Sequence, residues 1–349
     1  MSLSSPYDFI IQWHLTEKCN LRCRHCYQEG ATYQEMPFPL ISAVITEITH
    51  MVQTWQDAYD IEFSLSFNVT GGEPFLRADF FVILEAMIHA GVACYVLSNG
   101  TLISPERARR LADLGVKEVQ VSLEGPEEIH DGIRGLGSFA SSLKGIRNLL
   151  DAGVAASVNT TLSHLNAAYF RDLVELAARL GVRRLGFSRL VPSGRGLGLL
   201  DHLLAPDEVK ALYETIFSLK SQGLELATGD PMAAQMREPR PVEDAGTFPA
   251  GGCAAGVAGL TILADGTVTP CRRLPLPLGR VGQDSLRQIW AVSPVLERLR
   301  DRSQYQGKCG QCKRWANCRG CRAIAYASAP SQGNPDFLAP DPQCFIDAD

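Results

Sequence analysis

Three cysteines near the N-terminus have a spacing that suits a metal cluster. Cys19, Cys23 and Cys26 are separated by three and then by two residues. Three thiolates from one short loop can hold three corners of a cubane iron–sulfur cluster, which leaves the remaining iron without a protein ligand. Because such an iron is open to another molecule, it can take part in a reaction, whereas a cluster with four cysteine ligands mainly carries electrons. The spacing therefore predicts a reactive 4Fe–4S centre.

Two other interpretations of these cysteines stay open at the level of sequence. They could be three unrelated buried thiols, or they could hold zinc. A structural zinc site has four Cys or His ligands, which commonly come from two separate pairs. His25 lies between two of the cysteines, but one short loop would then have to surround the metal on every side.

Seven further cysteines lie in the C-terminal part of the chain. They are Cys253, Cys271, Cys309, Cys312, Cys318, Cys321 and Cys344. Pairs separated by two residues commonly bind zinc, so one or two zinc knuckles are one interpretation. Additional iron–sulfur clusters are the other, and the cluster predicted at the N-terminus favours it. The eleventh cysteine, Cys94, stands between apolar neighbours and is expected to be an ordinary core thiol.

The composition is that of an ordinary globular protein with unusual cysteine use. The chain has 349 residues, 46% of them hydrophobic and 20% charged, which suits a barrel-type domain with or without a smaller appendage. It has eleven cysteines and no secretory signal peptide, a combination that favours metal or redox chemistry over a disulfide framework. No apolar stretch reaches the roughly 18 residues of a membrane span. We therefore expect a cytoplasmic protein with no membrane partner.

The net charge of −5 gives no reason to expect a nucleic-acid partner, but the charges are unevenly distributed. Residues 272–322 contain twelve Lys or Arg against three Asp or Glu, a local balance of +9, so the rest of the chain carries −14. One interpretation is a set of solvated helix faces. The other is that the basic groups offset thiolate-ligated clusters and attract an acidic electron donor.

Short apolar runs alternate with amphipathic stretches between residues 9 and 225, which is typical of parallel strands joined by crossover helices. The predicted strands span residues 9–16, 63–70, 93–98, 118–123, 155–161 and 184–190. The predicted helices span residues 40–59, 79–90, 105–114, 138–152, 168–180 and 206–222. The expected fold class is α/β, with a partial (β/α)6 TIM barrel over residues 1–225. Residues 226–349 are expected to form a cysteine-rich, loop-dominated C-terminal extension, with a hairpin at 261–268 and a helix over 285–300.

Polar motifs follow the predicted strands at their C-terminal ends, where barrel enzymes carry their chemistry. The cysteine loop follows the first strand. The others are residues 70–74 (Thr-Gly-Gly-Glu-Pro), 98–101 (Ser-Asn-Gly-Thr), 121–125 (Val-Ser-Leu-Glu-Gly), 159–161 (Asn-Thr-Thr) and 190–196 (Leu-Val-Pro-Ser-Gly-Arg-Gly). Each alone is an ordinary turn or a buried hydroxyl. Because all of them converge on one barrel mouth beside the cysteine loop, we expect an active site there.

With this pattern the chain resembles the radical S-adenosylmethionine (SAM) superfamily. The resemblance is carried by the Cys-x3-Cys-x2-Cys loop, the Tyr27 that follows it and the Gly-Gly-Glu-Pro motif, and it covers essentially the whole barrel. It implies an enzyme in which Cys19, Cys23 and Cys26 hold a 4Fe–4S cluster whose open iron binds SAM. The reduced cluster would cleave SAM to a 5′-deoxyadenosyl radical that abstracts hydrogen from a substrate, so that the cofactor carries the difficult step.

The resemblance also implies which residues surround SAM. Backbone groups of Gly71, Gly72 and Glu73 would line its methionine end. The adenine would meet Tyr27 and the backbone of Leu190 and Val191. The remaining implied contacts are Ser98 and Asn99 beside the cofactor, Ser122 and Glu124 near the ribose, and Arg134 at the carboxylate.

The cysteine-rich region is similar to the SPASM extension of radical SAM enzymes, which carries auxiliary iron–sulfur clusters. By that pattern Cys309, Cys312, Cys318 and Cys344 would hold an outer cluster, which leaves Cys253, Cys271 and Cys321 for an inner one. The chain departs from the usual pattern at one point: two residues, not three, separate Cys318 from Cys321. Because seven thiolates cannot fully ligate two clusters, the inner cluster would keep an open iron, a non-cysteine ligand or fewer irons. We expect substrate to reach this site.

Relatives in this group modify ribosomally synthesised peptides or proteins by crosslinking, epimerisation or oxidation, and others alter tetrapyrrole side chains on the way to haem. Peptide or protein modification is the expected function, and modification of a tetrapyrrole (haem precursor) or of another small-molecule substrate is the alternative. A non-enzymatic iron–sulfur electron carrier is a third hypothesis, but it would not need the motifs at the strand ends. Only 18 residues precede Cys19, so leader-peptide binding is expected to be absent, remote or the task of a separate protein. The expected reductant is a flavodoxin or ferredoxin.

Overall fold

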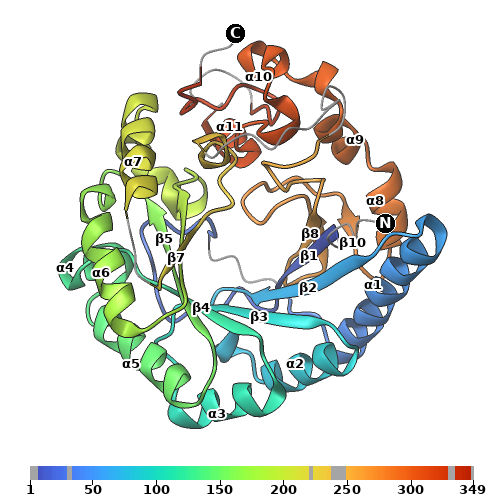
Figure 1. Ribbon diagram of the computed structural model, residues 1–349. Helices are drawn as coiled ribbons and strands as arrows, with labels where there is room; N and C mark the ends of the chain where they lie inside the picture. Colours follow the sequence, from blue (N-terminus) through green and yellow to red (C-terminus); the bar gives the residue numbers. More distant parts are fainter. Residues whose placement is uncertain (1–6, 30–33, 220–222, 237–248, 329–334, 347–349) are drawn as a thin grey trace.

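The computed structural model describes residues 7–29, 34–219, 223–236, 249–328 and 335–346, and its core is one ten-stranded sheet (Figure 1). The strand order is β10-β9-β8-β1-β2-β3-β4-β5-β6-β7. Seven strands pair in chain order and in parallel: β1 (Tyr7–His14), β2 (Phe63–Thr70), β3 (Ala93–Ser98), β4 (Glu118–Ser122), β5 (Ala156–Leu162), β6 (Arg184–Arg189) and β7 (Glu225–Ala227). They curve into an open barrel, so the carboxyl ends of the strands meet at one mouth.

Helices cover the outside of this barrel (Figure 1). They are α1 (Phe38–Tyr59), α2 (Phe80–His89), α3 (Pro105–Leu114), α4 (Glu127–Arg134), α5 (Ser138–Asp151), α6 (Phe170–Leu180) and α7 (Pro206–Ser218). The predicted partial barrel is confirmed, and the structure adds the short helix α4 and the strand β7, which the sequence did not predict. The last residues of the helix predicted over 206–222 lie outside the described residues.

Apolar residues at helical spacing hold α1 against the barrel wall. Six side chains are buried on one of its faces: Ile41, Val44, Ile45, Ile48, Met51 and Val52. Their period of three to four residues is that of an amphipathic helix. On the sheet side, the alternate residues Phe9, Ile11 and Trp13 of β1 are buried in the same core. This packing fixes β1, the strand from which the cysteine loop leaves.

The C-terminal part joins the same sheet on the far side of β1. β8 (Gly259–Ile262) pairs with β1 in parallel, in a register that places Ile10 opposite Gly259. A Cβ at position 259 would lie 1.8 Å from the Ile10 carbonyl oxygen, so the close pairing requires glycine there. β9 (Thr267–Thr269) then folds back antiparallel to β8, which confirms the predicted hairpin, and β10 (Gly279–Arg280) follows it.

The single helix predicted over residues 285–300 was wrong in one respect, because the structure has two short helices there. α8 (Leu286–Val292) and α9 (Pro294–Arg300) are separated by Ser293, whose backbone is extended (φ −64°, ψ 122°). The residue before a proline is pushed out of the helical region, so Pro294 ends the first helix and starts the second.

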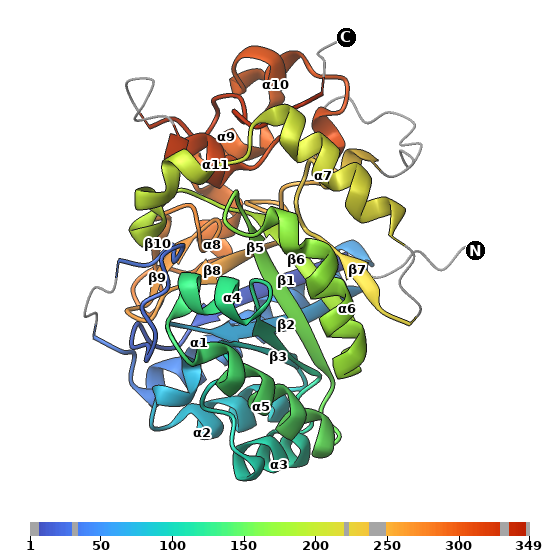
Figure 2. The same ribbon diagram turned by 90° about the vertical axis from the view of Figure 1, so that its left-hand side faces the viewer.

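Loops and short helices make up the rest of the extension, as expected. They include α10 (Gly307–Gln311) and α11 (Arg322–Ser328), which lie at the same end of the molecule as α7 (Figure 2). None of the helices within the described ranges combines the length and apolar character that crossing a membrane requires.

Candidate active site

The cysteine loop leaves β1 at the barrel mouth and lines a solvent-open cavity of about 970 Å³. All three cysteines, Cys19, Cys23 and Cys26, contribute to its wall. Eight of the other residues implied to contact SAM line the same cavity: Tyr27, Gly71, Gly72, Ser98, Asn99, Ser122, Arg134 and Val191. The other three, Glu73, Glu124 and Leu190, are buried and do not line the cavity.

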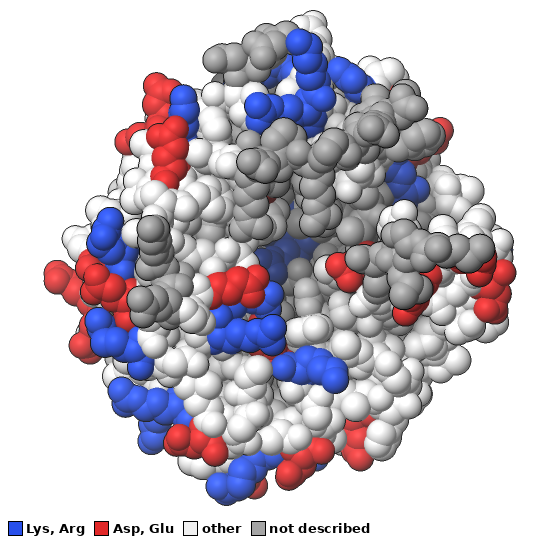
Figure 3. All heavy atoms as spheres, in the orientation of Figure 1, with Lys and Arg blue, Asp and Glu red and all other residues white. Residues whose placement is uncertain are grey.

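Figure 3 shows a hollow near the middle of this face, with Lys or Arg atoms deep inside it. The basic residues that line the cavity are Arg134, Arg195, Arg272 and Arg273. Polar side chains from the strands complete the wall, among them Gln120 on β4, Asn159 and Thr161 on β5, and Ser188 on β6. The alternation of side chains along each strand aims these residues into the barrel, although no motif marked Gln120 or Ser188.

The two glycines after β2 let the chain pass very close to the start of the cysteine loop. The Gly72 N–H donates to the Thr16 carbonyl over 2.6 Å, and the Glu73 N–H donates to the Lys18 carbonyl over 2.7 Å. A Cβ on Gly72 would lie 2.2 Å from the Lys18 oxygen, and one on Gly71 would lie 2.5 Å from the Thr16 oxygen. These positions therefore require glycine for close backbone approach, and they fix the base of the cysteine loop.

The Glu73 carboxylate joins the ends of β2 and β3 behind the cavity. It accepts hydrogen bonds from the Ser98 hydroxyl and from the Asn99 N–H, both over 2.8 Å. Burial raises the pKa of Glu73 to about 7, despite these hydrogen bonds, which favour the ionised form. The side-chain nitrogen Nδ2 of Asn99 in turn lies 3.9 Å from the Cys19 sulfur. The side chain of Glu73 therefore positions Ser98 and Asn99, two residues that line the cavity.

Arg134 is anchored by a buried carboxylate beside the cysteine loop. Its Nε and Nη2 donate to Oε1 of Glu124 over 2.8 and 2.6 Å, and His25 Nε2 lies 3.1 Å from the same oxygen. Burial is the largest single effect and opposes ionisation of Glu124. The charges of Arg134 and His25, with the hydrogen bonds from His25 and the Thr161 N–H, together outweigh it and hold the pKa of this carboxyl well below its usual range. Arg134 Nη1 lies 3.8 Å from the Cys23 sulfur. Glu124 thus acts on the cavity through Arg134.

The segment after β6 packs on the other side of the cysteine loop. The Gly196 N–H donates to the Cys26 carbonyl over 3.0 Å. Gly194 has a φ of +55°, and a Cβ there would lie 2.4 Å from the Tyr27 carbonyl carbon, so both its conformation and its surroundings require glycine. Val191, at the start of this segment, lines the cavity.

Tyr27 lies between two residues that no sequence motif marked. Its hydroxyl is 3.4 Å from Nε2 of the fully buried His14, and the Arg272 guanidinium carbon lies 5.8 Å from the centre of its ring. Burial, helped by the charge of Arg272, lowers the pKa of His14 to about 3, so this histidine is neutral at physiological pH. A histidine at a strand end and an arginine after a cysteine have no distinctive spacing, so no motif indicated that these side chains meet.

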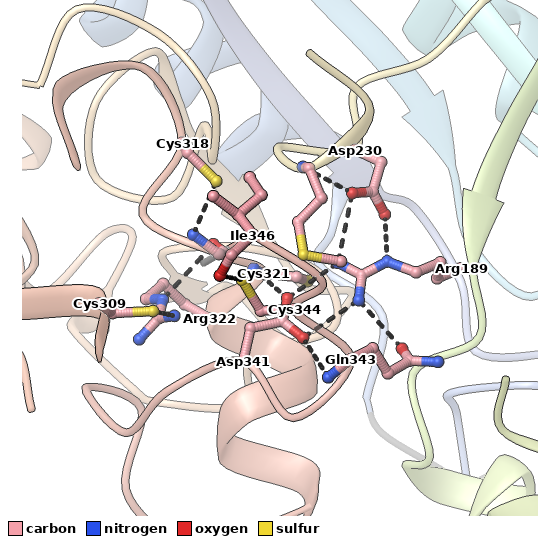
Figure 4. A network of polar contacts seen from close by, with 12 residues as sticks. Arg189, Asp230, Cys309, Cys318, Cys321, Arg322, Asp341, Gln343, Cys344 and Ile346 are labelled. Atoms are coloured by element: carbon pink, nitrogen blue, oxygen red, sulfur yellow. Dashed lines mark hydrogen bonds and ion pairs between the residues drawn. The ribbon is translucent and has the colours of Figure 1, made fainter. Parts of the chain in front are cut away.

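Four cysteines from separated segments line a second, smaller cavity of about 360 Å³. They are Cys309, Cys312, Cys318 and Cys344, the set that the SPASM resemblance implies for an outer cluster. Hydrogen-bond donors surround their sulfurs. The Gly320 N–H lies 3.4 Å from the Cys318 sulfur, and Arg322 Nη2 lies 3.7 Å from the Cys309 sulfur (Figure 4).

The other three C-terminal cysteines lie outside that smaller cavity, on the side of the barrel. The Cys253 N–H donates to the Cys318 carbonyl over 3.1 Å. Arg273 lines the large cavity and is close enough to Cys271 and Cys321 to interact electrostatically with both. The arrangement places the implied inner-cluster cysteines between the two cavities.

Arg189 ties the barrel to this region (Figure 4). It lies at the end of β6 and is fully buried. Its Nε donates to Asp230 Oδ2 over 2.7 Å, its Nη2 to Asp341 Oδ2 over 2.8 Å and its Nη1 to Gln343 Oε1 over 3.1 Å. Asp341 Oδ2 also accepts from the Cys321 N–H over 2.8 Å, so one guanidinium connects the barrel to the cysteine-rich segment.

The basic stretch over residues 272–322 has both exposed and buried members. Four of its members are exposed: Arg287, Arg298, Lys313 and Arg314. Arg319 and Arg322 are buried among the cysteines, where Arg319 donates to the Cys253 carbonyl. Positive charges inside the cysteine-rich region can offset the negative charge of thiolate-ligated clusters.

Comparison with known proteins agrees with this geometry. The model of the Radical SAM superfamily matches residues 13–177, and the model of the SPASM iron-sulfur cluster-binding domain matches residues 253–322. The AdoMet-dependent heme synthase of Nitratidesulfovibrio vulgaris is 31% identical over 353 residues, which cover 97% of this chain and 93% of that protein. The mycofactocin maturase MftC of Mycobacterium ulcerans is 32% identical over 349 residues, which cover 96% and 87%.

The fold is also that of a solved structure. Streptococcus suis SuiB bound to S-adenosylmethionine matches with a TM-score of 0.75 at 17% identity, and the match covers 97% of this chain and 78% of SuiB. At this identity the likeness concerns the fold alone.

Proposed function

The chain belongs to the radical SAM superfamily and carries a SPASM domain, and we propose that it uses this chemistry to modify a ribosomally synthesised peptide or protein. It is an enzyme with SAM, a 4Fe–4S cluster and auxiliary iron–sulfur clusters as cofactors. Together, SAM and the reduced cluster supply a 5′-deoxyadenosyl radical that abstracts hydrogen from the substrate.

One observation carries the proposed site. Cys19, Cys23 and Cys26 line the same cavity as the motifs from five strand ends. In this proposal the three thiolates hold the 4Fe–4S cluster, and a donor set of three sulfurs from one loop fits a cubane with an open iron. The backbone of Gly71 and Gly72, with Glu73 behind it, would hold the methionine end of SAM, and the cavity wall around Tyr27 and Val191 would hold the adenine.

The chain's own residues hold and orient the cofactors. Asn99 and Ser122 line the cavity from β3 and β4, where they can hydrogen-bond to SAM. Arg134, held by Glu124, presents a cation for the SAM carboxylate. Glu73 and Leu190 support this wall from behind.

We propose two auxiliary clusters in the C-terminal part, residues 226–349, and the SAM-binding barrel in residues 1–225. The four cysteines around the smaller cavity, Cys309, Cys312, Cys318 and Cys344, would hold the outer cluster. Cys253, Cys271 and Cys321 would hold the inner one, which would lack a fourth cysteine and would be open to substrate. Spectroscopy that found every auxiliary iron fully ligated by protein without substrate would contradict this assignment.

The proposed activity has a direct test. Anaerobically reconstituted, reduced protein should convert SAM to 5′-deoxyadenosine. The triple variant Cys19→Ala/Cys23→Ala/Cys26→Ala should lose this activity completely and retain the iron of the auxiliary clusters. The matched control is Cys94→Ala, since that thiol is buried in the barrel core and should leave iron content and activity unchanged. An electron carrier would produce no 5′-deoxyadenosine in any form.

The substrate class needs a second experiment. The mycofactocin maturase supports a peptide substrate, whereas the haem synthase, of which the match covers 93%, supports tetrapyrrole modification as the second candidate. Incubation with a short peptide encoded beside the gene, and separately with an iron tetrapyrrole that carries propionate side chains, should yield a mass change in one of them. A mass change in the tetrapyrrole alone would replace the peptide proposal.

The proposed partners follow from the chemistry. A flavodoxin or ferredoxin would supply the electron, and a separate protein would bind a leader peptide if the substrate has one. We place the enzyme in the cytoplasm, where such reductants occur.

A further inference from the structure

Two adjacent arginines face the large cavity without a carboxylate partner. Arg272 and Arg273 directly follow Cys271 and line the cavity beside the cysteine loop. Among the described residues, neither forms an ion pair with Asp or Glu. Two guanidinium groups that line a cavity without a paired carboxylate have N–H donors with which they can bind an anion.

Two other arginines near the barrel mouth do form ion pairs with carboxylates. Arg134 is paired with Glu124, and Arg189 with Asp230 and Asp341. Each of these pairs includes a hydrogen bond of 2.6–2.8 Å to a carboxylate oxygen. Arg195, which also lines the cavity, has no ion pair among the described residues either, but its Nε donates to the Cys23 carbonyl over 3.1 Å.

The contacts of the two arginines leave their donors available. Arg273 Nη1 makes a hydrogen bond of 3.4 Å to the Arg189 carbonyl, and its Nε is buried without a hydrogen-bond partner. The guanidinium of Arg272 lies 5.8 Å from the centre of the Tyr27 ring, which faces the cavity beside Cys26. Arg273 has the sulfurs of Cys271 and Cys321 and the carboxylate of Asp230 nearby. Arg272 has the Tyr27 ring and the Cys271 sulfur as neighbours, and no carboxylate.

We propose that Arg272, assisted by Arg273, binds a carboxylate of the substrate and so positions the substrate between SAM and the inner cysteines. This inference rests on the proposed function and names the chemistry of the substrate that the site selects. A planar guanidinium pairs with a carboxylate through two parallel hydrogen bonds, which fixes orientation as well as distance. The carboxylate belongs to a peptide or to a tetrapyrrole propionate, and both present the same group to Arg272.

The SAM carboxylate would be a second anion in this cavity. The residue proposed to bind it is Arg134, which lies beside the cysteine loop. Arg134 Nη1 is 3.8 Å from the Cys23 sulfur, so it lies next to the iron that the cluster would place there. Arg272 comes instead from the cysteine-rich part, one residue after an inner-cluster cysteine. A carboxylate bound to Arg272 would therefore lie near both the Tyr27 ring and the inner-cluster cysteine Cys271.

Binding to matched probes with and without the carboxylate tests the inference. Mesoporphyrin IX and its dimethyl ester form one pair, and a mixed hexapeptide library with free C-terminal carboxylates and its C-terminal amide form the other. With SAM bound to the reconstituted protein, we expect at least one pair to show a preference of about tenfold or more for the acid. Arg272→Gln should abolish this preference, and Arg272→Lys should restore part of it. The pair that responds identifies the source of the carboxylate.

The control variant is Arg287→Gln, since Arg287 is exposed on α8 and should leave the preference unchanged. SAM affinity and the slow substrate-free formation of 5′-deoxyadenosine should stay within twofold of the wild type in Arg287→Gln, and both are also measured in Arg272→Gln. A tenfold loss of SAM affinity in this variant would overturn the inference, because it would assign Arg272 to the cofactor. Equal binding of acids and neutral forms by the wild-type protein would also overturn it, without any variant. In both cases SAM cleavage by the wild type would leave the proposed function standing.

Discussion

Arg189 and Asp341 form a fully buried ion pair, with Nη2 and Oδ2 2.8 Å apart, although 152 residues separate them in the chain. The pair holds the end of β6 against the segment that leads to Cys344. Because Asp341 also accepts the N–H of Cys321, the barrel and the cysteine-rich region share one hydrogen-bonded centre.

Breaking this pair should destabilise the protein strongly. Asp341→Asn leaves the buried Arg189 with less negative charge around it, and loss of one partner of a buried pair typically costs about 3–5 kcal/mol. We expect a free energy of unfolding lower by an amount near that range, together with partial loss of auxiliary iron. Urea unfolding of the anaerobic holoprotein and iron analysis measure both. Glu175→Gln, which removes the exposed pair with Arg179, is the control and should have little effect. Equal effects of the two variants would refute the structural role of Asp341.

Gly72→Ala should disturb the cysteine loop without touching a thiol. The new Cβ would stand 2.2 Å from the Lys18 carbonyl oxygen, so the chain before Cys19 has to move. We expect 5′-deoxyadenosine formation to fall about tenfold or more, because a shift of about 1 Å can cost that much in an aligned site. Gly198→Ala is the matched control, since nothing lies within 4 Å of its new Cβ. Activity equal to that of the control would show that the loop does not need this close approach.

The pKa of Glu73 should appear in the pH dependence of stability. Burial raises this pKa from 4.5 to about 7, so the folded protein holds the proton over a range in which the unfolded chain has lost it. The contribution of Glu73 is therefore most favourable below pH 4.5 and is lost as pH rises through 7. We expect the free energy of unfolding of the wild type to fall relative to Glu73→Gln by up to about 3 kcal/mol across this window.

Chemical denaturation at several pH values measures that difference. The exposed Glu128→Gln provides the reference, and its difference from the wild type should stay flat. A flat difference for Glu73→Gln as well would mean that Glu73 is ionised at all these pH values in the folded protein.

Glu124→Gln should weaken SAM binding, although Glu124 does not line the cavity. Without its charge, Arg134 loses the partner that holds Nε and Nη2, and its remaining donor is no longer fixed beside Cys23. We expect the SAM dissociation constant to rise about tenfold, which corresponds to about 1.4 kcal/mol. Equilibrium dialysis with labelled SAM gives the value, and iron content checks that the cluster is intact. Unchanged SAM affinity in a cluster-loaded variant would remove Arg134 from the proposed carboxylate site.

Local patterns were sufficient to predict the barrel and the groups of cysteines. Short apolar runs alternate with amphipathic stretches along the chain, and this pattern predicts the strands and helices of the barrel. Cys19, Cys23 and Cys26 are close in sequence, so their proximity in space follows without tertiary information. The outer set is a stronger case. Cys344 comes from a separate segment, but the family pattern placed it with Cys309, and the structure brings both to one cavity.

Contacts between distant segments could not be predicted in this way. Helix α4 has only two buried residues, His130 and Ile133, so its apolar face is too small to give a clear helical period. The approach of Arg272 to Tyr27 depends on how the cysteine-rich part docks on the barrel, and no residue spacing encodes that. The break between α8 and α9, in contrast, was readable from Pro294, since a proline restricts the residue before it.

The parallel pairing of β8 with β1 has a consequence for the integrity of the barrel. Without β8, the backbone N–H and C=O groups of Ile10 to Trp13 would form an uncapped edge strand, and an apolar edge of this kind invites intermolecular pairing. The C-terminal part, which carries the seven downstream cysteines, therefore also covers the β1 edge of the barrel sheet. A barrel cut after residue 225 is expected to aggregate before any loss of cluster chemistry can be measured.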